Sequence, residues 1–185
     1  MRAFFFLLIT TFIMMTASAQ MNQEVVSSTI PVDEATGLIT YKEVIEEPGT
    51  KDTLFNRGSS WLHTFYPNPW DAAKIRDQSS GLIKIQHQFK IYDYDELGNK
   101  SDAGMVLYNA KIEFRENRYR VQIDNFVYKL VSRYPAERWM DKTAPDYSPK
   151  WENYLDQIDN FAKNELIPSL KKKMQPAKQY KEEDW

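Results

Sequence analysis

The chain contains two histidines and no cysteine, so few of its side chains could carry out chemistry. His63 lies outside the apolar stripe of a predicted helix and is expected in solvent. His87 lies on the inward side of a predicted strand, where a hydrogen-bonded core histidine is commoner than a ligand or a catalytic base. Without cysteine, disulfides, thiol catalysis and thiolate metal sites are excluded. We therefore predict no metal site and no cofactor.

Two serine pairs and one acidic loop do not match the motifs that they suggest. Ser59-Ser60 falls inside a predicted helix and Ser79-Ser80 in a loop before a strand, and neither has the G-x-S-x-G spacing of a nucleophile elbow. The loop from Asp93 to Gly98 begins like a calcium loop, but Leu97 stands where an oxygen ligand is needed. We interpret this loop as a charged hairpin connection.

A polar sheet face is the main candidate site. Apolar and polar side chains alternate from Ile83 to Tyr92, which is the pattern of a half-buried strand. If helices cover the apolar side, the other side displays amide and cationic groups, flanked by Tyr92 and Phe126, that suit a peptide, a glycan or an anionic head group. The alternative is a solvated face without a ligand. The candidate ligand-binding residues are Gln86, Gln88, Lys90, Arg120 and Gln122.

Turn residues and apolar periodicity predict the elements that position this face. An opening strand covers residues 38–45 and is followed by a helix that Thr50 caps and Pro67 ends. Gly58 lies on the apolar stripe of this helix, where it allows close approach of a strand. Further strands are predicted over residues 83–92, 105–114 and 119–128, joined by a polar loop and a tight turn that contains Asn117.

The C-terminal part is predicted to hold a loop and one long helix. Prolines make residues 134–147 a loop, whereas residues 129–134 could extend the sheet. Ser148 is expected to cap a helix that starts at Pro149, and Pro168 could kink it. The order of elements predicts an α+β fold, with an antiparallel sheet of four to five strands and helices on one face.

The first residues resemble an export signal. Arg2 precedes an apolar run from Ala3 to Met15, and Ala17-Ser18-Ala19 forms a small-residue cleavage site. The run is too short to span a bilayer, and no later segment could span one, so no transmembrane span is expected after cleavage. We expect a signal peptide over residues 1–19, a leader over 20–36, one domain over 37–174 and a disordered tail over 175–185.

Overall charge argues against a polyanionic partner. The chain has 24 basic and 26 acidic residues and a sequence pI near 5.8, so it has no general attraction for nucleic acid. Its composition is 42% hydrophobic and 27% charged, which is typical of a globular domain with an ordinary core.

Three stretches resemble a known family. They are the opening IPVDEATGLITYKEVIEEPGTKDTLFNRGSSWL, the alternating strand from Ile83 to Ile91, and ENRYRVQIDNF. Together they resemble exported bacterial domains of unknown function with a TBP-like fold, of the DUF4468 type. The resemblance implies a β-α-β4-α arrangement like one repeat of the TATA-binding protein, in secreted or envelope proteins of Gram-negative bacteria. It implies neither an activity nor DNA binding, and residues 134–147 stand out from it as an insertion.

Three functional hypotheses follow. We favour a non-enzymatic exported domain that binds an envelope protein, peptide or glycan through the open sheet face, in the periplasm or outside the cell. The second is a hydrolase of envelope material that uses Glu113 and Asp124, which requires the two carboxylates within about 5 to 10 Å of each other. The third is a structural or assembly subunit that oligomerises through the long helix.

Overall fold

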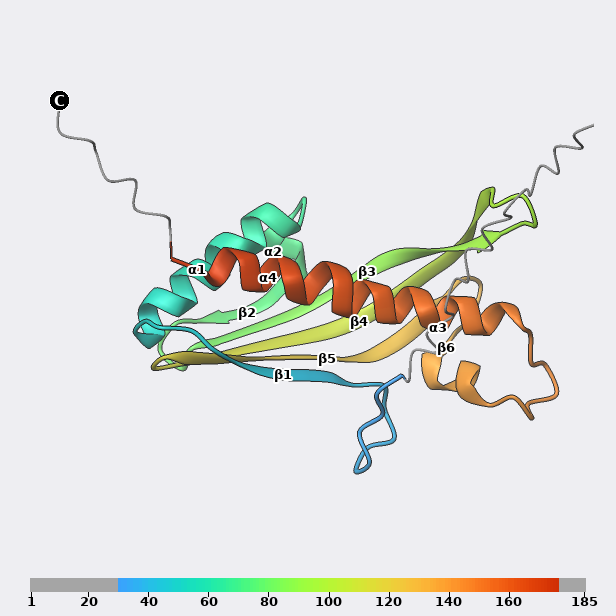
Figure 1. The fold of residues 1–185 in the computed structure, drawn as a ribbon, viewed down its shortest axis with the longest axis horizontal. Coiled ribbons are helices and arrows are strands. Elements are labelled where there is room, and N and C mark those ends of the chain that lie inside the picture. The colour runs from blue at the N-terminus through green and yellow to red at the C-terminus, as the bar shows by residue number, and fades with distance from the viewer. Residues whose placement is uncertain (1–29, 177–185) are drawn as a thin grey trace, which may run out of the picture.

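The computed structural model describes residues 30–176, in which a six-stranded antiparallel sheet carries helices on one face (Figure 1). The strand order is β1-β5-β4-β3-β2, and β6 pairs with β5 beyond the end of β1. The predicted signal peptide, most of the leader and most of the tail lie outside the described residues. The elements are β1 (Tyr41–Glu46), α1 (Lys51–Phe65), α2 (Pro69–Ala72), β2 (Ala73–Asp77), β3 (Leu82–Tyr94), β4 (Lys100–Arg115), β5 (Arg118–Lys129), β6 (Arg133–Pro135), η1 (Ala136–Met140), α3 (Lys150–Asn160), η2 (Phe161–Leu166) and α4 (Ile167–Met174).

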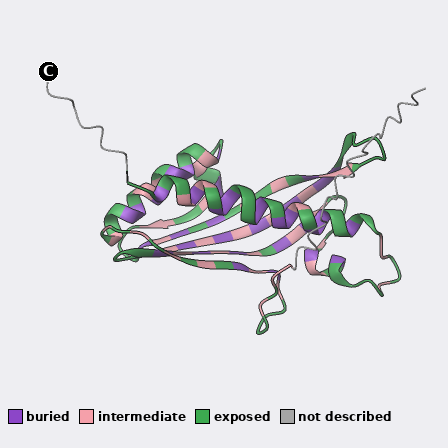
Figure 2. Cartoon of the chain, in the orientation of Figure 1, coloured by how far each residue is buried: buried purple, intermediate pink, exposed green. Residues whose placement is uncertain are grey.

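The predicted α+β fold with helices on one face is confirmed. Buried and less buried residues alternate along β3, β4 and β5, because one side of each strand faces the helices (Figure 2). Within residues 30–176, no helix combines the length and the apolar character needed to cross a membrane.

Strand β2 was missed, and two strands are longer than predicted. Strand β2 is a short edge strand whose pairing with β3 shifts register between Ala73 and Ile75, so its sequence shows no clean alternation. Strands β3 and β4 continue past residues 92 and 105, which shortens the predicted loop to residues 95–99. There the Asp95 carboxylate accepts hydrogen bonds from the backbone of Leu97 and Asn99. With β2 included, the main elements follow the order β-α-β4-α.

Residues 134–147 are more ordered than the predicted loop. They contain most of β6 and all of η1, and Trp139 is only 1% exposed. Its ring packs against Tyr128 and Tyr154, with ring centroids 5.3 and 5.2 Å away. Pro135 is tolerated because it lies at the end of an edge strand, where its missing N–H leaves no ladder bond unmade. The prolines therefore mark an edge strand and a short helix.

The long C-terminal helix starts and bends differently from the prediction. Pro149 occupies the N-cap position, and no side chain, including that of Ser148, caps the helix. Just before Pro168 the helix widens over η2, a π-helical segment where Ile167 N–H donates to the Ala162 carbonyl. Pro168 has no N–H and its ring crowds the preceding turn, which accounts for the changed pairing. Figure 1 shows α3, η2 and α4 as one continuous helix along the sheet.

Aromatic contacts and two hydrogen bonds, one buried and one partly buried, fix the helices to the sheet and to each other. Phe161 stacks on Phe89 of β3, with ring centroids 4.1 Å apart. The Tyr41 hydroxyl donates to Asp159 on α3 at 2.9 Å, which ties the edge strand β1 to the helix. Trp61 Nε1 of α1 donates to Ser169 Oγ of α4, also at 2.9 Å. The sheet face beneath these helices is therefore fully occupied.

Helix α1 begins and packs as predicted. The Thr50 side chain accepts a hydrogen bond from Thr53 N at 3.1 Å, which confirms the N-cap. Gly58 is buried, and a Cβ atom at this position would lie 2.4 Å from Cζ of Phe114 on β4. The absence of a side chain therefore sets how closely α1 approaches the sheet.

Substitution Gly58→Ala should lower the free energy of unfolding by about 1 to 3 kcal/mol, because the added methyl group overpacks against Phe114. On a free helix surface the same change would stabilise by about 1 kcal/mol. Urea unfolding measures the difference, with Ser60→Ala on the exposed side of α1 as the control. A more stable Gly58→Ala protein would contradict the close approach.

Candidate ligand-binding face

The sheet face opposite the helices, called here the open face, is built by strand alternation. Residues that face each other across the ladders lie in rows, such as Gln86 with Asn109 and Lys84 with Lys111 and Gln122. Most of these side chains are amides or cations. The open face includes Lys84, Gln86, Gln88, Lys90, Leu107, Asn109, Lys111, Glu113, Arg115, Arg118, Arg120, Gln122, Asp124 and Val127.

All five candidate residues lie on the open face, but they do not form one site. Lys90 pairs with Met105 of β4, whereas Arg120 pairs with Glu113, eight positions further along the same strand. At about 3.4 Å per residue, these two rows are about 27 Å apart. The face therefore divides into a central region and a corner near the β4–β5 turn.

The central region contains two adjoining shallow depressions, with volumes of about 520 and 370 Å³. Gln86 and Asn109 line both, while Gln88 and the apolar Leu107 and Val127 line the larger one. Within residues 30–176, the side chains of Gln86 and Gln88 form no hydrogen bond. Their amides are therefore available to a ligand, beside an apolar surface that could contact it.

The other three candidate residues already have partners. Lys90 Nζ lies 2.9 Å from Asp102 Oδ2, and this hydrogen bond raises the pKa of Lys90. Gln122 Nε2 donates to Asp124 Oδ2 at 2.7 Å. Arg120 donates through Nε and Nη2 to Glu113 Oε2, at 2.8 Å from Nε. A ligand would have to displace or share these contacts.

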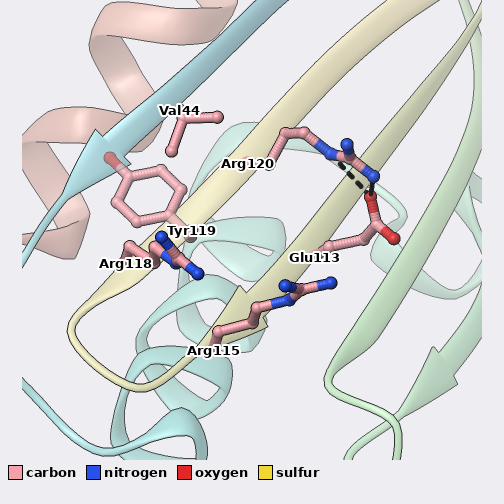
Figure 3. Close-up of a pocket in the computed structure, with 6 residues that line it drawn as sticks. All are labelled: Val44, Glu113, Arg115, Arg118, Tyr119 and Arg120. Atoms are coloured by element: carbon pink, nitrogen blue, oxygen red, sulfur yellow. Dashed lines mark hydrogen bonds and ion pairs between the residues drawn. The ribbon is translucent and has the colours of Figure 1, made fainter.

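The corner region places three arginines around a small hollow (Figure 3). Arg115, Arg118 and Arg120 line it together with Glu113 and Val44, and its volume is about 140 Å³. Sequence analysis identified Arg120 but assigned the other two to the turn. The sequence RENRYR could have identified both arginines. Two arginines flank its two-residue turn, and Arg118 lies two positions before Arg120, so both side chains point to the same face of the strand.

The prediction that Phe126 lies on the open face is wrong. Asn125 adopts a positive φ of 54°, and the β4–β5 register shifts between Leu107 and Asn109. This bulge inserts one residue into β5 and reverses the alternation after it. Phe126 is consequently fully buried, with its ring centroid 5.9 Å from that of Tyr41, and Val127 takes its place on the open face.

The carboxylates of the hydrolase hypothesis are not arranged for catalysis. Asp124 pairs with Asn109, four positions along β4 from Glu113, so the two backbone sites are about 14 Å apart. Burial raises the pKa of Glu113, but hydrogen bonds from Arg120 and Lys111 outweigh it and hold the pKa below its ordinary value. Within residues 30–176, no three metal-ligating side chains gather around a point.

Of the two histidines, His87 contributes to the lining of the larger central depression and His63 does not. His87 is on the helix-covered side, as predicted, with its ring centroid 5.0 Å from that of Tyr66. Partial burial lowers the pKa of His87. His63 is exposed on α1, with its ring beside that of Trp70.

Comparison with known proteins agrees with this architecture. Residues 41–129, from the start of β1 to the end of β5, match the family model described as a domain of unknown function (DUF4468) with a TBP-like fold. This part of the chain is similar to DUF4468 domains. No curated protein matches this chain.

Two solved structures share the fold of this chain. A TBP-like protein from Parabacteroides distasonis is 17% identical, with a TM-score of 0.65 over 80% of this chain and 99% of that one. A DUF4468 family protein from Bacteroides ovatus is 14% identical, with a TM-score of 0.64 over 85% of this chain and 95% of that one. At this level of identity the likeness establishes the fold alone.

The bulge at Asn125 can be tested by substitution. Asn125→Val should lower the free energy of unfolding by about 1 to 2 kcal/mol, because a β-branched residue is strained at positive φ. Asn125→Gly is the matched control and should change it by less than about 1 kcal/mol. Urea unfolding distinguishes the two variants. Equal tolerance of valine and glycine would argue against the bulge and against burial of Phe126.

Proposed function

We propose that this protein is an exported, non-enzymatic binding module that holds a peptide or glycan of the cell envelope on the open face. The observation that carries the proposal is the one-sided packing of the helices. It leaves a broad sheet surface whose central depressions combine unpaired amides with Leu107 and Val127. Amides and apolar surface side by side suit ligands that present hydroxyl or peptide groups beside carbon skeletons.

The alternatives receive less support from the same geometry. A hydrolase would need two carboxylates about 5 to 10 Å apart, whereas the backbone sites of Glu113 and Asp124 are about 14 Å apart. A general acid would also need a raised pKa, whereas the pKa of Glu113 is lowered. An assembly subunit that used the long helix would need an apolar stripe outside the core. The stripe of that helix, including Ile158, Leu166 and Leu170, is instead buried against the domain itself.

Export rests on the first 19 residues, which lie outside the described part of the chain. Their charge, apolar run and cleavage site support delivery to the periplasm or the exterior of a Gram-negative bacterium. An envelope ligand would be encountered in either place. The expected compartment and the chemistry of the open face therefore both suit an envelope ligand.

The double substitution Gln86→Ala/Gln88→Ala should weaken ligand capture without unfolding the protein, because both side chains are exposed and unpaired. The chain from Gln20 onward would be screened on arrays of envelope glycans and peptides. We expect binding by the wild type and at least about a tenfold loss in the variant, since two hydrogen bonds are removed. Asn56→Ala/Asn164→Ala, which removes two exposed amides from the helix side, is the control.

Equal capture by the wild type and the Gln86→Ala/Gln88→Ala variant would remove the central region from the proposed site. No capture of any peptide or glycan by the folded wild type would contradict the proposed ligand class.

A further inference from the structure

We infer that the corner region of the open face, made by Arg115, Arg118 and Arg120, binds a phosphate group of the ligand. This inference rests on the proposed function, because it takes the open face to be the binding surface. It adds that the ligand carries a phosphate group, which the amide side chains of the central region do not specify.

The first observation is a pair of like charges without compensation. Arg115 and Arg118 are direct partners in the β4–β5 ladder, and both are exposed. Like charges at directly opposed positions destabilise a sheet. Neither arginine forms an ion pair with any residue from 30 to 176, although Glu46 is the β1 partner of Arg118. An anion between the two guanidinium groups would supply the missing charge.

The second observation is that the backbone beneath the pair is fixed. The Glu116–Asn117 turn is hydrogen-bonded to the β1–α1 connection: Asn117 N donates to Gly49 O at 2.9 Å and Glu47 N donates to Asn117 O at 3.0 Å. The neighbouring side chains of Phe114 and Tyr119 are buried on the opposite face. The arginines therefore extend from a preformed platform, which lowers the entropic cost of binding.

The third observation is the role of Glu113. It accepts hydrogen bonds from Arg120 and lies 3.1 Å from Lys111 Nζ, so it holds Arg120 at the edge of the hollow (Figure 3). Glu113 compensates only part of the local charge. Four cations, namely Lys111 and the three arginines, stand against the carboxylates of Glu46, Glu113 and Glu116, and that of Glu116 accepts a hydrogen bond from the backbone N–H of Lys51. The corner is thus positive in a chain whose formal net charge is −2.

The chemistry favours phosphate over other anions. A guanidinium group presents its N–H donors as a planar fork that matches two oxygens of a phosphate. Two unpaired forks complement a dianionic phosphate monoester, and a hollow of about 140 Å³ admits one such group and no polymer. The lack of general attraction for polyanions is consistent with this local site, because the formal net charge of the whole chain is −2.

The test is a titration of the 15N-labelled chain from Gln20 onward, which contains all described residues, with inorganic phosphate at low ionic strength. We expect amide shifts around residues 115–120 and a Kd on the order of 1 mM, as two exposed charge-assisted contacts would give. Arg115→Ala/Arg118→Ala should weaken binding at least about tenfold. The control Lys100→Ala/Lys129→Ala removes two positive charges at the other end of the sheet and should change binding by less than about twofold.

A second variant distinguishes bidentate hydrogen bonding by the guanidinium groups from electrostatic attraction alone. Arg115→Lys/Arg118→Lys keeps both charges but cannot bind bidentately, and it should weaken phosphate binding about threefold or more. Phosphate binding by this variant equal to that of the wild type would overturn the assignment. So would equal binding by the wild type and the double alanine variant, or no binding by the folded wild type.

The source of the phosphate is resolved by a second probe. Vesicles that contain phosphatidic acid, compared with vesicles of phosphatidylcholine alone, present the same group as a lipid head group. Arginine-dependent binding both to free phosphate and to the phosphatidic acid vesicles would assign a membrane lipid, whereas arginine-dependent binding to free phosphate without binding to those vesicles would assign a soluble ligand. If Gln86→Ala/Gln88→Ala loses capture while phosphate does not bind, the proposed function stands and this inference fails.

Discussion

The contact between the C-terminal helix and the middle of the sheet is the interaction on which the rest of the structure depends. Phe161 stacks on Phe89 and lies 4.9 Å from the Tyr108 ring, measured between ring centroids. Because successive strand residues point to opposite faces, burial of Phe89 and Tyr108 places Gln88 and Leu107 on the other side. The composition of the open face is therefore a direct consequence of what the helix covers.

This constraint also explains why the open face divides into two chemistries. The central region lies opposite the aromatic core and carries amides and small apolar side chains, whereas the corner lies beside a turn and carries arginines. The bulge at Asn125 sharpens the division, because it withdraws Phe126 into the core and presents Val127 in its place. A ligand would thus meet polar and apolar contacts in the centre and positive charge at one corner.

Sequence patterns predicted the parts of the fold that obey regular rules. The strand from Ile83 to Tyr92 and the helix cap at Thr50 were both predicted correctly, because each follows from local geometry. Strand β2 and the helix at Trp139 were not, since a short edge strand and a single helical turn show no periodicity and are stabilised by tertiary contacts. The bulge at Asn125 was missed because asparagine tolerates a positive φ but does not require one. The position of Arg115 beside Arg118 was missed because it depends on the register of the turn.

The most direct test of this account is whether the open face is accessible in solution. The chain has no cysteine, so a single introduced thiol reports on its own position. Gln88→Cys on the open face should react with a maleimide within about threefold of its rate in the unfolded chain, whereas Ala110→Cys, on the helix-covered face and 2% exposed in the native structure, should be protected at least about a hundredfold. Protection of both thiols in the folded protein would mean that the second face is also covered, and it would contradict the account.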